Sequence, residues 1–208
     1  MTFELWLAFV AASTALLIIP GPTILLVLSY ALSQGRQVAI ATAAGVAMGD
    51  LIAMTAALAG LGAVIATSAA AFTALKWVGA AYLLYLGTKM LRSAPGKSAL
   101  TAAPAQAPRA IFRHAAIVTA LNPKGIGFFI AFVPQFITPA APFAPQAAIL
   151  IATFVGLAAV NALAYALAAD AMRARLTRPG IIHRLTQAGG LTLIAMAALT
   201  ATLRRSTP

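Results

Sequence analysis

Long apolar runs separated by short polar segments dominate the pattern of this chain. A helix needs about 20 mainly apolar residues to cross a hydrocarbon core of ~30 Å. Six runs have about that length or more, and we expect each of them to form a transmembrane helix. They cover residues 5–33, 38–66, 70–91, 112–137, 147–169 and 185–203. The pattern therefore predicts an all-α polytopic membrane protein with six spans.

Two of these runs, the first and the fourth, are interrupted near their middle. The interruptions consist of residues that end or cap a helix: Pro20, Gly21 and Pro22 in the first run, and Asn122, Pro123 and Lys124 in the fourth. Lipid cannot satisfy the backbone groups that such a break frees, so a break persists only where it is buried in protein or lines a cavity. Broken helices at membrane depth are typical of the binding sites of transporters.

A segment rich in Ala and Pro, residues 93–111, divides the six runs into two groups of three. We interpret it as a cytoplasmic linker between a first repeat, residues 1–92, and a second, residues 112–208. Because three is odd, the second group enters the membrane from the opposite side. The two breaks fall in the first helix of each group, which is the correspondence expected of inverted repeats. The sequence thus predicts two inverted three-helix repeats with helices 1 and 4 broken.

Composition and charge support a membrane protein and set its orientation. Of the 208 residues 62% are apolar and 8% charged, whereas a soluble domain has roughly 25% charged residues. The net charge of +11 comes from short connections between the runs and not from a basic face with interleaved aromatics, so nucleic acid is not an expected partner. By the positive-inside rule the first, third and fifth connections are cytoplasmic and both termini lie outside. These connections contain Arg36; Lys89, Arg92, Lys97, Arg109 and Arg113; and Arg173, Arg175, Arg178 and Arg184.

One acidic residue, Asp50, falls near the centre of a predicted span. A carboxylate at that depth costs several kcal/mol unless it is protonated or paired. Asp50 is therefore the candidate for proton coupling. The alternative is a fixed ion pair with Lys76 or Lys124 that only holds helices together.

The half-helix after each break offers free amides and a positive dipole end near the midplane, where they could bind a substrate carboxylate. The alternative is that each break merely kinks a packed helix. Asn161 and Lys76 are candidate supporting residues: Asn161 for an interhelical hydrogen bond, and Lys76 with a side chain that can extend to the interface. The predicted substrate-binding residues are Pro20, Gly21, Pro22, Thr23, Asn122, Pro123 and Lys124.

Several short motifs occur in a fixed order between residues 5 and 137. They are PGP at 20–22, SQGR at 33–36, GVAMGD at 45–50, GAAYLLYLG at 79–87, LNPK at 121–124 and PQF at 134–136. In these motifs and their spacing the chain resembles the LysE/RhtB family of amino-acid exporters, in particular its RhtB-like branch. The resemblance implies proton-driven efflux of amino acids or related small metabolites across the bacterial inner membrane.

The family pattern also bears on specificity. Exporters of basic amino acids in the family carry an acidic residue shortly after the Asn-Pro pair, where this chain has only apolar residues and glycines at 125–129. We therefore expect a neutral substrate such as homoserine, threonine or leucine. Thr23 stands where many relatives have Asn, so we expect a side-chain contact from this position to differ from the contact in those relatives.

The expected partners are the amino acid, protons and the lipid bilayer, without a cofactor or bound metal, because the chain has no Cys and the spans hold no carboxylate cluster. An enzymatic role is not expected, since the spans hold no paired Asp. A non-transporting membrane assembly factor, an exporter of another metabolite or cation, and assembly as a homodimer remain open alternatives.

Overall fold

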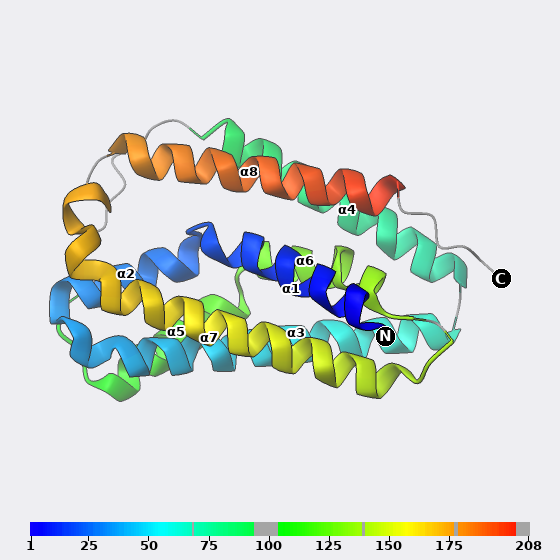
Figure 1. The fold of residues 1–208 in the computed structure, drawn as a ribbon, viewed down its shortest axis with the longest axis horizontal. Helices are drawn as coiled ribbons and strands as arrows, with labels where there is room; N and C mark the ends of the chain where they lie inside the picture. Colours follow the sequence, from blue (N-terminus) through cyan, green and yellow to red (C-terminus); the bar gives the residue numbers. More distant parts are fainter. Residues whose placement is uncertain (68, 94–103, 139, 177–178, 203–208) are drawn as a thin grey trace.

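The structure, a computed structural model, describes residues 1–67, 69–93, 104–138, 140–176 and 179–202 (Figure 1). All regular elements in these ranges are helical. They are α1 (Phe3–Ile18), α2 (Pro22–Gln34), η1 (Arg36–Val38), α3 (Ala39–Thr67), α4 (Ala69–Leu91), α5 (Pro108–Ala120), α6 (Pro123–Ala131), η2 (Val133–Phe136), α7 (Phe143–Leu176) and α8 (Pro179–Thr202).

Both predicted breaks are present. Helices α1 and α2 form one interrupted rod with a bend of 54°, and α5 with α6 forms a second with a bend of 46°. Pro22 and Pro123 occupy the first positions of α2 and α6. Proline suits this position because its fixed φ is helical and the amide it lacks would have no partner there. The proline positions thus set where each second half-helix begins.

Several helices of the described part can cross a membrane. Three are long and apolar enough on their own, namely Arg36–Val64, Phe143–Ala169 and His183–Thr202, and the two bent pairs raise the number to as many as five. Helix α4, which coincides with the expected span at 70–91, is not among them. The structure confirms an all-helical membrane architecture among these residues, and the sixth span stays a prediction.

Three helices extend beyond the apolar runs that predicted them. Helix α5 begins at Pro108 and not at residue 112, α7 extends from Phe143 to Leu176, and α8 begins at Pro179. Hydropathy reports only the part of a helix that lies in hydrocarbon, so the polar ends of these helices escaped it. Of the predicted linker, residues 94–103 lie outside the described residues.

The helices run roughly along the long axis of the molecule and pack in three groups across it (Figure 1). Helices α4 and α8 lie side by side on one side, α1, α2 and α6 lie in the middle, and α3 packs against α5 and α7 on the other side. Glycines permit the closest approaches. A Cβ on Gly45 or Gly49 of α3 would lie 2.5 Å from the carbonyl oxygen of Phe112 or Ala116 in α5. Small residues spaced four apart on one helix allow such close helix contacts.

A cluster of phenylalanines fills the centre of the bundle. Phe129 and Phe154 meet edge to face with ring centroids 4.9 Å apart, and Phe9 meets Phe136 at 5.3 Å. Its buried members are Phe9, Phe128, Phe129, Phe132, Phe136 and Phe154. The outer surface, in contrast, exposes large apolar side chains such as Ile40 and Val160. Lipid, not water, is the solvent that this surface fits.

Candidate functional site

The two breaks face each other across the middle of the molecule. The Thr23 hydroxyl, at the start of α2, accepts a 3.0 Å hydrogen bond from Asn122 Nδ2 and one of 3.3 Å from the Thr119 hydroxyl. All three side chains are buried. Residues about a hundred positions apart in the chain are therefore joined at the point where each rod is interrupted.

Lys124 binds the end of the first half-helix. Its ammonium donates hydrogen bonds to the carbonyl oxygens of Leu16 at 3.0 Å and Ile19 at 2.8 Å. The last carbonyls of a helix have no partner within that helix. A cation at this position also interacts favourably with the negative end of the helix dipole. Lys124 thus satisfies backbone groups that the break in the other rod exposes.

Two side chains of α7 satisfy the carbonyls in between. Asn161 Nδ2 donates to Leu17 O at 3.0 Å, and the Tyr165 hydroxyl donates to Ile18 O at 2.6 Å. Together with Lys124 they bind four consecutive carbonyls, those of residues 16–19. Tyr165 was not among the residues predicted from the sequence, although its position four residues after Asn161 puts both on one helix face.

The starts of the second half-helices differ. Asn122 caps α6, because its side-chain oxygen accepts a 3.1 Å hydrogen bond from the Lys124 amide. Gly21 stands at the corresponding position of α2 and offers no side-chain cap. Within the described part of the chain, the amides of Thr23 and Ile24 have no acceptor. The α2 terminus therefore retains free donors, which favour an anion.

Asp50 of α3 lies beside these groups. It is 6% exposed, and it makes no hydrogen bond or ion pair with any residue that the structure describes. Lys124 is the cation that acts on it electrostatically. The direct ion pair that was one reading of the sequence is not formed in this conformation, because the Lys124 ammonium is held by the α1 carbonyls.

Two cavities adjoin the breaks. The smaller has about 30 Å³ and is lined by Asp50, Thr23, Ile24, Phe154 and Asn161 among others. Since one water needs about 10–15 Å³ by a similar measure, it holds roughly two waters. The larger has about 340 Å³ and is lined by residues of α2, α4, α6 and α8. Gly21, Asn122 and Lys124 line both cavities.

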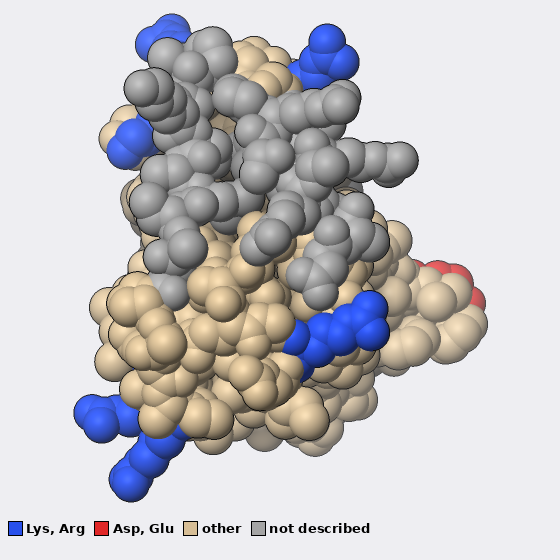
Figure 2. Space-filling view, turned by 90° about the vertical axis from the view of Figure 1, so that its left-hand side faces the viewer, with Lys and Arg blue, Asp and Glu red and all other residues tan. Residues whose placement is uncertain are grey.

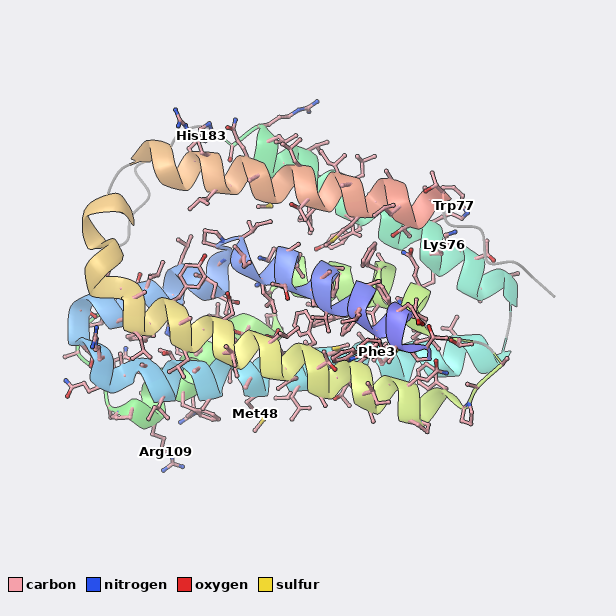
Figure 3. The ribbon with its side chains drawn as sticks, in the orientation of Figure 1. Phe3, Met48, Lys76, Trp77, Arg109 and His183 are labelled. Carbon is pink, nitrogen blue, oxygen red and sulfur yellow. The ribbon has the colours of Figure 1, made fainter. Side chains whose placement is uncertain are left out.

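Most residues singled out in the sequence meet at these cavities. Asp50, Thr23 and Asn161 line the smaller one, whereas Pro20, Pro22 and Pro123 line the larger one. Lys76 is the exception. It lines neither cavity and lies in the N-terminal part of α4, away from the α4 residues that line the larger cavity. Its ammonium is 5.9 Å from the Trp77 ring centroid (Figure 3).

Comparison with known proteins bears on the family of this chain. A model of the LysE type translocator family matches residues 14–204. The chain belongs to the LysE type translocator family. The family expected from the ordered motifs is thereby confirmed.

The relatives of this translocator are similar over almost their full length. The homoserine/homoserine lactone efflux protein of Salmonella typhimurium is 34% identical over 99% of this chain and 100% of its own. The leucine efflux protein of Salmonella choleraesuis is 31% identical over 94% of each chain. An uncharacterized membrane protein of Vibrio cholerae is 30% identical over 98% of this chain and 100% of its own. No solved structure matches the chain.

Proposed function

We propose that this translocator exports neutral amino acids of the homoserine, threonine or leucine type from the bacterial cytoplasm, in exchange for protons. The observation that carries the proposal is the meeting of two helix breaks around a buried carboxylate, Asp50, and the ammonium of half-buried Lys124. The efflux functions in the names of its relatives support the substrate class. Asp50 is the one carboxylate among the described residues that line the two cavities, which favours a substrate side chain without positive charge.

The architecture that we propose for it has six spans in two inverted repeats. The bent pair α1–α2, α3 and α4 would correspond to the bent pair α5–α6, α7 and α8. Similar bends of 54° and 46° at the start of each half support this pairing. So does the packing of α3 on α7 and of α4 on α8. In such transporters the substrate site lies between the repeats.

The orientation follows from charge. Figure 2 shows Lys and Arg side chains spread over the face at one end of the long axis. Arg109 and His183 lie at this end, whereas Phe3 and Trp77 lie towards the opposite one (Figure 3). By the positive-inside rule the basic end would face the cytoplasm, and the N-terminus and the end of α8 would then lie on the outer side of the inner membrane.

The two ends of the site differ in a way that fits one state of an alternating-access cycle. The larger cavity reaches Lys89, Ser93 and Thr186 near the basic end. Towards the other end, the phenylalanine cluster from Phe154 to Phe136 fills the space. The cycle would bring a proton from outside to Asp50 as the substrate leaves outwards, with the substrate carboxylate held by Lys124 and the free amides of α2.

An efflux screen tests this proposal. Purified protein is reconstituted into vesicles, each batch is loaded with one amino acid, and the exterior is acidified. We expect the acid exterior to accelerate efflux of leucine, threonine or homoserine and to leave lysine and arginine inside. If no amino acid leaves faster than from protein-free vesicles, the protein is not the exporter proposed, and a non-transporting role would replace it.

A further inference from the structure

We propose that the side chain of the exported amino acid binds in the larger cavity, against an apolar wall built by α2, α4 and α8, and not beside Asp50. This inference rests on the proposed export function and names the residues that select its substrate. The wall consists of Leu25, Leu86, Met90 and Leu193. None of these four residues belongs to the broken-helix motifs at 20–22 and 121–124, although Leu86 is part of the motif at 79–87.

The two cavities differ in volume, and this difference indicates different functions. The cavity beside Asp50, at about 30 Å³, admits water and protons but no amino acid. The larger cavity has about 340 Å³, within the range of small-molecule sites. Of these two cavities, the larger can hold a substrate in this conformation, while the smaller one can supply the proton.

The chemistry of the wall selects a neutral, aliphatic side chain. Leu193 is buried, and Leu25, Leu86 and Met90 are half-buried. Only three acidic residues occur in the chain, and no acidic residue is among the described residues that line this cavity. A lysine or arginine side chain would therefore lie unpaired against hydrocarbon, which costs several kcal/mol.

The carboxylate of the substrate would bind at the end of the larger cavity that adjoins the helix breaks. Lys124, Gly21 and Asn122 form the partition between the two cavities. A Cβ on Gly21 would lie 3.3 Å from Lys124 Cε, so a glycine keeps the ammonium close to the break. A carboxylate at this partition would meet Lys124 while the side chain points along the wall. At this partition, binding of the substrate and binding of the proton would then influence each other.

Competitive efflux tests the wall directly. Vesicles are loaded with equal concentrations of leucine and homoserine, and the ratio of their efflux rates is measured for Leu86→Ala and Leu25→Ala. Loss of apolar contact changes discrimination between such side chains by about tenfold or more. We expect both variants to lower the leucine-to-homoserine ratio by about that factor. The matched control is Leu84→Ala, since Leu84 is on the same helix as Leu86, is 48% exposed and does not line the cavity.

The outcomes separate the two proposals. If wild-type vesicles export both amino acids but the ratios of Leu86→Ala and Leu25→Ala equal that of Leu84→Ala, the wall does not bind the side chain and this inference is wrong. If wild-type vesicles export neither amino acid, the proposed function itself fails. The use of two variants on different helices guards against loss of either one through misfolding.

Discussion

The Lys124 ammonium lies 2.8 Å from the carbonyl oxygen of Ile19, so a side chain of the second half of the chain closes the helix break of the first half. The same ammonium binds Leu16 O at 3.0 Å. Hydrogen bonds from a charged donor contribute about 1.5–3 kcal/mol each. This relationship makes Lys124 a structural residue as well as a candidate substrate ligand.

Replacing Lys124 with Met should destabilise the protein and abolish export. The change leaves the carbonyls of Leu16 and Ile19 without donors in a membrane interior, at a cost of about 3 kcal/mol or more. Thermal unfolding in detergent and vesicle efflux measure the two effects. Lys76→Met is the matched control, because Lys76 lines neither cavity, and its efflux should stay near that of the wild type. Equal losses in both variants would argue against a special role for Lys124.

Asp50→Asn should abolish proton-driven export while the protein remains folded. The carboxylate makes no hydrogen bond with the residues that the structure describes, so an amide of similar shape can replace it without breaking a contact. Efflux under an imposed pH gradient should fall to the level of protein-free vesicles. Glu4→Gln, at the start of α1, should export normally. Undiminished, pH-dependent export by Asp50→Asn would remove this residue from the mechanism.

Tyr165→Phe should cost about 1 kcal/mol, the usual contribution of one neutral hydrogen bond. Its hydroxyl is the donor to Ile18 O at 2.6 Å, and phenylalanine removes only that donor. A melting temperature lower by about 2–4 °C is expected for a chain of this size. Tyr85→Phe serves as the control, since Tyr85 is 56% exposed and its hydroxyl makes no hydrogen bond among the described residues. If the two variants have equal melting temperatures, the Tyr165 hydroxyl does not stabilise the helix break.

A methyl group at Gly49 should disrupt the packing of α3 on α5. The new Cβ would lie 2.5 Å from Ala116 O and 2.6 Å from Thr119 Cβ, so the helices must separate. Overpacking of this kind costs about 1–3 kcal/mol. Gly60→Ala on the same helix is the matched control, because nothing lies within 4 Å of its added Cβ. Melting temperatures of the two variants in detergent test the difference, and the account requires Gly49→Ala to melt lower.

Local chemistry explains which parts of the site could be predicted from sequence. Pro22 and Pro123 determine the breaks by their own geometry, and Asp50 is conspicuous in an apolar run, so these features needed no knowledge of packing. The partners of Lys124 and Tyr165 are backbone carbonyls, which every residue carries, so no sequence pattern identifies them. The residues of the apolar wall of the larger cavity could not be identified from the sequence either. A leucine that lines a cavity and one that faces lipid look alike in a membrane sequence.

The central claim is that the two helix breaks meet inside the membrane, and a cysteine pair tests it most directly. The chain has no cysteine, so Thr23→Cys with Asn122→Cys introduces the only two thiols. The native side-chain atoms are 3.0 Å apart. A short thiol-reactive crosslinker applied to membranes, followed by cleavage of an engineered protease site in residues 94–103, reports whether the halves are joined. The account predicts joined halves for this pair and separated halves for each single-cysteine variant. Halves that separate for the pair, in protein shown to be folded, would contradict it.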